Sequence, residues 1–266
     1  MSKRFEFDVT KGITALIYGQ PGSGKTRLSA SAALDPKDRW GKVLMLEAFG
    51  NPMSIRDYDR KPDIVTIEDM EDFNEPYEWL TGGQPEEHPF CKDFNLTPPY
   101  KTVIVDGLTE VQRFVIRKVS GVDFTGPGDL TPLLGRQGFG QLLGTMLNWA
   151  THFVKLADLG LNVILTSLEA SSEEAGVAKS KPLFWGQSGG EICGYVLLVI
   201  RLTTQLAAPK SLMTHPNDPV YPDSNNVAFF RETTTHYAKD QYYIGIDHLV
   251  DPTMANLMDL LERSNN

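Results

Sequence analysis

Short runs of β-branched and aliphatic residues alternate along the chain with longer segments in which apolar residues recur every three or four positions. This alternation predicts an α/β fold with a mainly parallel sheet flanked by helices, because a helix after each strand returns the chain to the same edge of the sheet. The runs that predict strands are 13–18, 43–46, 64–67, 103–105, 163–165 and 195–202. The segments that predict helices are 25–33, 71–80, 107–119 and 137–158.

The pattern changes after residue 202. A loop rich in Pro, Asn and Asp over 203–226 precedes two predicted antiparallel strands, 227–232 and 235–239, and a final helix over 252–263. With no internal repeat and no linker, we expect one domain over 1–266, with 203–266 packed on its core. Two Gly/Pro-rich stretches, 120–135 and 169–190, are expected to be long loops of the kind that often carry function.

Composition excludes several classes of protein. The chain has 266 residues, 41% of them hydrophobic, which is enough for a sizeable core and excludes a disordered chain. Its two cysteines, Cys91 and Cys193, are far apart and signal neither a disulfide framework nor a zinc site. The apolar run over 195–200 is too short to span a bilayer. We therefore expect a soluble cytoplasmic protein without a membrane partner.

The net charge of −9 argues at first against binding to nucleic acid. The acidic excess lies mostly in residues 56–93, which hold 12 Asp and Glu against 4 Lys and Arg. The rest of the chain is nearly neutral and has no strong basic stripe. The charge therefore neither excludes nucleic acid nor supports it.

A phosphate-binding motif stands directly after the first predicted strand. Gly19-Gln20-Pro21-Gly22-Ser23-Gly24-Lys25-Thr26 matches the pattern G-x-x-x-x-G-K-[ST] and opens a predicted helix, which is the context that supports the motif. Backbone N–H groups of such a loop surround phosphates, Lys25 reaches the β- and γ-phosphates, and Thr26 ligates Mg²⁺. We expect this loop, together with Arg27, to bind ATP with Mg²⁺.

A second acidic position completes the expected metal site. Residues 101–105 form a run buried on both faces, and Asp106 follows at the end of that strand. A P-loop enzyme holds the water shell of its metal with such a carboxylate, so Asp106 is the expected Mg²⁺ partner. Asp106 followed by Gly107 is also typical of a helix cap.

The order of these segments resembles a known family. The P-loop, 43–47, 103–110 and 162–169 are similar to the RecA-like P-loop ATPase core. More narrowly, the chain resembles short phage nucleotide-binding proteins, classed as AAA-type ATPases, that include single-strand annealing recombinases. Phe229-Phe230-Arg231 and Tyr237-Ala238-Lys239-Asp240 are similar to the strand pair and the "AKDR" stretch of that group.

The resemblance implies a catalytic carboxylate at the end of the strand after the P-loop helix, where it polarises the attacking water. Glu47 holds that position, although the family often reads Asp-x-Glu-Gly there and this chain has Phe49 in place of the second acid. Glu110 and Glu169 are alternative bases, and an acid at a strand end can also be merely exposed.

Two polar residues end an otherwise apolar strand. Thr166 and Ser167 resemble the position that senses the γ-phosphate, and Thr166 is the expected nucleotide contact. Hydroxyls at that position can equally cap the following turn.

The resemblance also places the stretches 120–135 and 169–190 where such recombinases contact DNA. Lys179, Lys181 and Trp185 combine cations with an aromatic ring, which suits single-stranded DNA. The same stretch holds acidic residues, so a surface loop with a buried Trp explains it as well.

The resemblance also implies that the chain forms oligomers. These would be rings or filaments in which a cation from the neighbouring subunit completes each nucleotide site. Arg136, Arg231 and Lys239 are candidates, and Lys239 is favoured because it matches the family stretch, although Gln241 replaces the usual Arg. Each is also explained as a solvated surface cation.

Three functions compete at this point. The first is an ATPase acting in phage DNA recombination, single-strand annealing or replication, and the second is an assembly or regulatory ATPase that does not touch DNA. The third is a small-molecule kinase, for which an Arg-rich lid would be needed, and the 11 Arg residues form no such cluster.

Overall fold

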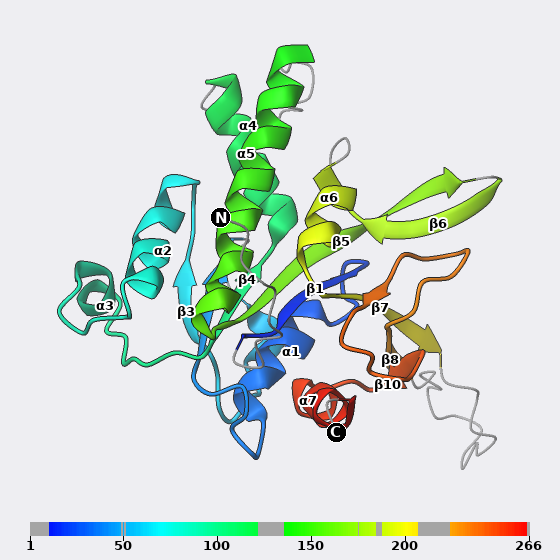
Figure 1. The fold of residues 1–266 in the computed structure, drawn as a ribbon, viewed down its shortest axis with the longest axis horizontal. Helices are drawn as coiled ribbons and strands as arrows, with labels where there is room; N and C mark the ends of the chain where they lie inside the picture. Colours follow the sequence, from blue (N-terminus) through cyan, green and yellow to red (C-terminus); the bar gives the residue numbers. More distant parts are fainter. Residues whose placement is uncertain are drawn as a thin grey trace, which may run out of the picture.

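The computed structural model describes residues 11–48, 50, 52–121, 136–174, 176–184, 188–206 and 224–264. A twisted sheet crosses the middle of the molecule, with helices on both of its faces (Figure 1). Six of its strands are parallel and lie side by side in the order β7, β1, β5, β4, β2, β3. Their bounds are β1 Thr14–Gly19, β2 Val43–Glu47, β3 Asp63–Thr66, β4 Thr102–Asp106, β5 Asn162–Glu174 and β7 Leu198–Leu206.

Antiparallel strands extend the sheet on the β7 side. β8 (Ser224–Phe229) pairs with β7, β10 (His248–Val250) pairs with β8, and the two-residue strand β9 (Lys239–Asp240) pairs with the beginning of β7. The predicted fold class is thereby confirmed, as a mainly parallel sheet flanked by helices with C-terminal antiparallel strands.

The apolar runs became central strands because both of their faces are covered. Every residue of β1, β2 and β4 is buried, as expected for strands with helices on each side. On one face lie α1 (Lys25–Ala30) and α7 (Met254–Ser264), which pack around a cluster that includes Ile17 and Ile164.

The opposite face packs against the other five helices around a second cluster that includes Leu16 and Val105. These helices are α2 (Asn74–Thr81), α3 (Pro89–Asp93), α4 (Leu108–Ser120), α5 (Arg136–Lys155) and α6 (Ser188–Tyr195). Short 3-10 helices occupy Ser31–Leu34, Met53–Ile55, Glu71–Phe73 and Leu156–Leu159. None of the described helices is both long enough and apolar enough to cross a membrane.

The stretch 169–190 is not the loop that the sequence predicted. β5 continues past the sheet to Glu174 and pairs antiparallel with β6 (Val177–Pro182), so residues 169–174 and 177–182 form the two strands of a projecting β-hairpin (Figure 1, right). The prediction failed because these strands carry Ser, Glu and Lys rather than an apolar pattern. α6 was not predicted because three of its eight residues are glycine, which disfavours helix. Residue 195, predicted as the start of a strand, is the last residue of α6.

The predicted C-terminal strand pair was also wrong in its partners. Residues 227–232 and 235–239 do not pair with each other, since β8 lies between β7 and β10 and only Lys239 and Asp240 form a strand. The predicted loop over 203–226 is strand at both ends, up to Leu206 and from Ser224, and its middle lies outside the described residues. Short α3 had not been predicted.

Candidate functional site

The P-loop lies at the carboxyl edge of the sheet, between β1 and α1. Gly19 is the last residue of β1, and a Cβ added to it would stand 2.0 Å from the carbonyl oxygen of Leu202. Gly24 has a φ of +89°, which disfavours any residue with a side chain. Both glycines are therefore required by the backbone of the loop.

The lysine of the motif lies along the loop. Lys25 Nζ donates hydrogen bonds to the carbonyl oxygens of Gly19 (3.0 Å) and Gln20 (2.9 Å). Burial lowers the pKa of Lys25, while the carboxylates of Asp106 and Glu169 oppose that shift. The side chain is thus held in the loop that the motif assigns to phosphate.

A serine inside the loop provides a separate test of phosphate binding. Ser23 is 3% exposed, and its Oγ has no hydrogen-bond partner among the described residues. A buried hydroxyl without a partner is costly in a folded protein. A phosphate oxygen at the loop would supply the missing partner, so the residues fit an anionic ligand.

The expected metal partners meet in one hydrogen-bond network. Thr26 Oγ1 donates to Asp106 Oδ2 (2.6 Å), and Thr166 Oγ1 donates to the other oxygen, Asp106 Oδ1. Thr166 Oγ1 also accepts from the backbone N–H of Gly107 (3.0 Å). A hydroxyl and a buried carboxylate are oxygen ligands, which suit Mg²⁺ with the rest of its shell made of water.

The network forms because the parallel strands β1, β5 and β4 are neighbours and run toward this edge. β4 brings Asp106, β5 brings Thr166, and β1 leads through the P-loop into α1, which brings Thr26. The sequence placed both side chains at strand ends, and the structure brings them together with Thr26. Ser167 points elsewhere, since its Oγ donates to the carbonyl oxygen of Leu168 (3.1 Å).

The three candidate bases have different surroundings. Glu47 is 3% exposed and stands beside Asp106, because the last residues of β2 and β4 are in register. Glu110 lies in the first turn of α4 and forms an ion pair with Arg113 (2.6 Å). Glu169 is bound by another cation, described below. Phe49 lies outside the described residues.

Glu169 and Arg201 form a buried pair at the base of the hairpin. Arg201 Nε and Nη2 donate to Glu169 at 3.0 and 3.2 Å, and Ser180 Oγ donates to the same carboxylate at 2.9 Å. Glu169 is therefore engaged structurally. Sequence reasoning gave no role to Arg201, although a lone charge in the apolar run 195–202 was an available signal.

Lys239 is engaged within its own chain. Its Nζ donates to the carbonyl oxygens of Cys193 (3.1 Å), Gly194 (3.0 Å) and Val196 (2.7 Å), so it caps the end of α6. Burial lowers the pKa of Lys239. It lies beside the beginning of β7, whereas the P-loop is at the carboxyl edge.

The other expected cations also have local contacts. Arg27 Nη1 donates to the carbonyl oxygen of Ser54 (2.6 Å) and to Asp57 (2.7 Å), so it holds the segment after β2 rather than facing the loop. Arg231 forms an exposed ion pair with Asp247 (3.2 Å). Arg136 begins α5, and its side chain lies outside the described residues.

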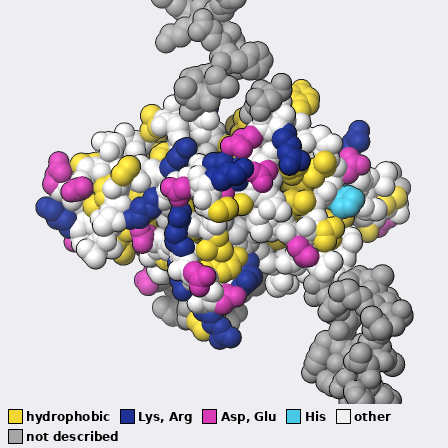
Figure 2. Space-filling view, turned by 90° about the horizontal axis from the view of Figure 1, so that it is seen from below, with side chains coloured by type: hydrophobic (Ala, Val, Ile, Leu, Met, Phe, Trp, Pro, Cys, Tyr) yellow, Lys and Arg dark blue, Asp and Glu magenta, His cyan; other side chains and the backbone are white. Residues whose placement is uncertain are grey.

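Of the expected DNA contacts, two lie on β6. Lys181 is exposed, and Lys179 forms an ion pair with Glu232 (2.7 Å). Trp185 lies outside the described residues. Figure 2 shows one face of the molecule, on which Lys and Arg are interspersed with Asp and Glu rather than gathered alone.

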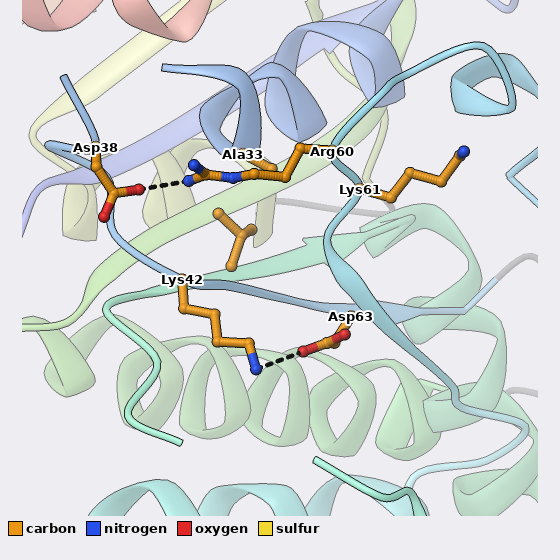
Figure 3. A pocket seen from close by; sticks show the side chains of 7 residues that line it. Ala33, Asp38, Lys42, Arg60, Lys61 and Asp63 are labelled. Carbon is orange, nitrogen blue, oxygen red and sulfur yellow. Dashed lines mark hydrogen bonds and ion pairs between the residues drawn. The ribbon is translucent and has the colours of Figure 1, made fainter. Parts of the chain in front are cut away.

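A separate pocket of about 300 Å³ lies at the opposite edge of the sheet, where β2 and β3 begin. Four of its charged residues form two ion pairs, Lys42 with Asp63 (3.1 Å) and Arg60 with Asp38, and Lys61 also lines it (Figure 3). None of the P-loop residues 19–26 lines this pocket.

Comparison with known proteins agrees with this geometry. Residues 11–242 match the family model of the AAA domain. A search of curated proteins found no match. Most of the chain lies in the matched segment, which includes the P-loop, Asp106 and Thr166. The chain therefore belongs to the AAA domain family of nucleotide-binding P-loop ATPases.

Proposed function

We propose that the chain binds ATP with Mg²⁺ at residues 19–26 and hydrolyses it. The observation that carries the proposal is the network in which Asp106 accepts hydrogen bonds from Thr26 and Thr166 beside the P-loop. A glycine-rich turn that binds no ligand does not require a buried carboxylate such as Asp106 beside it. A nucleotide site requires such a carboxylate, together with nearby hydroxyls, to hold its metal ion.

Each residue then has a role in the attack of water on the γ-phosphate. Thr26 and Asp106 hold Mg²⁺, which when bound neutralises charge on the phosphate oxygens. Lys25 leaves the carbonyls of Gly19 and Gln20 to contact the β- and γ-phosphates. Glu47, buried beside Asp106, orients the water.

The variant Lys25→Ala tests this proposal. The hydrogen bonds that the change removes lie within the loop, so we expect the melting temperature to stay close to that of the wild type while phosphate release falls at least about 100-fold. Lys61→Ala, at an exposed lysine far from the loop, is the matched control. Unchanged turnover in Lys25→Ala would show that the loop is not the ATPase site.

The finer proposal is a role in phage DNA recombination, single-strand annealing or replication, in the cytoplasm of a bacterial host. Its support is the sequence resemblance and the hairpin of β5 and β6, which carries Lys179 and the exposed Lys181 away from the sheet. The competing role is an assembly or regulatory ATPase without DNA contact. It is favoured by the ion pair of Lys179 with Glu232, which leaves the hairpin with little free positive charge.

ATP hydrolysis with and without single-stranded DNA separates the two roles. Stimulation that is lost in Lys181→Glu and kept in Lys92→Glu, an exposed lysine on α3, supports DNA contact through the hairpin. No binding at low salt and no change in turnover would leave the regulatory ATPase.

We further propose that residues 1–266 work as one domain in a homo-oligomer, with a neighbour's cation completing each site. Arg27 and Arg201 lie near the P-loop and are each in an ion pair with a carboxylate of their own chain, which supports a cation supplied by a neighbour. Light scattering with and without nucleotide tests this: a larger mass with ATP is expected, and an unchanged monomer would contradict it.

A further inference from the structure

The P-loop has two sides, and the structure distinguishes them. On the side of β5, β4 and β2 lie Thr166, Asp106 and Glu47, the residues for the metal and the attacking water. On the other side lie β7 and β8. A bound triphosphate places its γ-phosphate on the side of the metal and the water. The sugar and base must therefore leave the loop toward β7 and β8.

A polar side chain on that second side reaches the loop. Asn226 lies on β8, opposite Thr204 of β7, and a Cβ added to Gly24 would stand 3.0 Å from Asn226 Nδ2. The Oδ1 of Asn226 accepts from Thr204 Oγ1 (3.2 Å). Its Nδ2 donates to no other described residue, so an amide donor beside the P-loop is available to a ligand.

The negative charge of Asp251, next to this amide, favours the uncharged nucleoside part of a nucleotide over its phosphates. Asp251 Oδ1 accepts the backbone N–H of Asn226 (3.1 Å), and the N–H of Asp251 donates back to the Asn226 carbonyl oxygen (2.7 Å). This carboxylate repels phosphate oxygens, whereas sugar hydroxyls and base edges offer it hydrogen-bond donors.

The same segment is fixed along the P-loop helix. Residues 251–253 lead into α7, where the N–H of Met254 donates to Ser31 Oγ (2.9 Å) just beyond α1. The space beside the start of α1 is thus bounded by Asn226 and by a segment held in place. A rigid boundary with an available amide is suited to recognition.

We propose that Asn226 is a nucleoside-binding residue, whose side-chain amide contacts the sugar or base of the bound nucleotide. The inference rests on the ATP binding proposed above and adds the residue that distinguishes a nucleotide from a bare polyphosphate. An Asn amide is a donor and an acceptor together, the combination that pairs with the edge of adenine.

The test measures the affinity of Asn226→Ala for ATP, ADP and inorganic tripolyphosphate by calorimetry. Loss of one or two neutral hydrogen bonds predicts about tenfold weaker binding of both ATP and ADP. Tripolyphosphate has no nucleoside, so its affinity should change by less than about twofold. Asn226→Asp, which keeps the shape but loses the donor, should weaken ATP binding at least as much.

The neighbouring Asn225→Ala is the matched control, because adjacent side chains of a strand point to opposite faces. ATP affinity should stay at the wild-type value in this variant. Equal weakening of tripolyphosphate and ATP in Asn226→Ala would show that Asn226 supports the loop instead, and unchanged ATP affinity would show no contact. A wild-type protein that binds neither ligand would overturn the ATP proposal itself.

Discussion

At the scale of single residues, the site depends on how Asp106 is held. Both of its carboxylate oxygens accept hydroxyl donors, one from the P-loop helix and one from β5. The side chain is only 7% exposed, so its orientation is set by Thr26 and Thr166 rather than by water. A carboxylate fixed in this way is ready to receive a metal without rearrangement.

Thr166→Val should lower the free energy of unfolding by about 1.5–3 kcal/mol, because it leaves Asp106 Oδ1 and the N–H of Gly107 without their partner in a buried place. Thr166→Ser keeps the hydroxyl and should stay close to the wild type. Urea unfolding of both variants measures the difference. Equal stability of Thr166→Val and Thr166→Ser would show that the Thr166 hydroxyl does not stabilise the fold.

His236 makes the fold sensitive to acid. Its ring is 4% exposed, with Nε2 3.1 Å from the Arg231 carbonyl oxygen and Nδ1 3.0 Å from Thr233 Oγ1. Burial, followed by the positive charge of Arg201, lowers the pKa of His236 from 6.5. The unfolded chain therefore takes up the proton first as the pH falls, and stability present above pH 6.5 is lost as the pH drops toward the folded pKa.

We expect the free energy of unfolding of the wild type to fall more steeply between about pH 7 and about pH 5 than that of His236→Gln. Urea unfolding at a series of pH values measures both slopes. His152→Gln, at an exposed histidine, should keep the wild-type slope. Parallel curves for His236→Gln and the wild type would rule out this histidine as the source.

At the scale of elements, β5 connects the metal site to the projecting hairpin. Thr166 lies in the part of β5 inside the sheet, and Glu169 lies three residues later, where β6 begins to pair with it. The buried ion pair of Glu169 with Arg201 joins the base of the hairpin to β7. Tyr18, just before the P-loop, also donates to the carbonyl oxygen of Ser180 on β6 (3.1 Å).

Breaking this pair from one side should be costly. Arg201→Met leaves the Glu169 carboxylate buried without its cation, which predicts a loss of about 3–5 kcal/mol in the free energy of unfolding. Replacing both residues with Met should restore part of that loss. A double-mutant cycle in urea measures the coupling, and strictly additive effects would mean that the pair does not hold the hairpin.

Substitution of Lys239 distinguishes a structural role, as the cap of α6, from a role at the nucleotide site of a neighbouring subunit. As the cap of α6, its loss in Lys239→Ala should lower the melting temperature by several degrees, because three carbonyl oxygens lose their donor. As a cation for a neighbour's nucleotide, its loss should lower ATP turnover at a constant melting temperature. Lys61→Ala, at an exposed lysine with no assigned role, is the control for both measurements.

At the scale of the whole molecule, the sheet separates two apolar clusters and places all the phosphate chemistry at one edge. The acidic stretch 56–93 lies over β3, α2 and α3, at the β3 end of the sheet. The proposed nucleoside side lies toward β7 and β8, in the other direction. Most of the acidic excess therefore lies away from the proposed nucleoside side, although Asp57 of this stretch pairs with Arg27 of α1.

The P-loop, its strand, Asp106 and the central strands could be predicted because each depends on local sequence. A strand buried on both faces needs a continuous apolar run, and a loop around phosphate needs glycine at set positions. The hairpin, α6 and the partners of β8 could not be predicted, because their residues are polar or glycine-rich and their pairing depends on distant segments.

The sequence by itself determined the α/β class, the phosphate loop and the carboxylate that faces it, since these follow from patterns within a few residues. Only the tertiary structure decided that Thr166 holds Asp106, that Glu169 belongs to Arg201, that Lys239 caps α6 and that Asn226 reaches Gly24. Each of these contacts joins residues far apart in the chain. Strand order brings them together, and no local pattern encodes strand order.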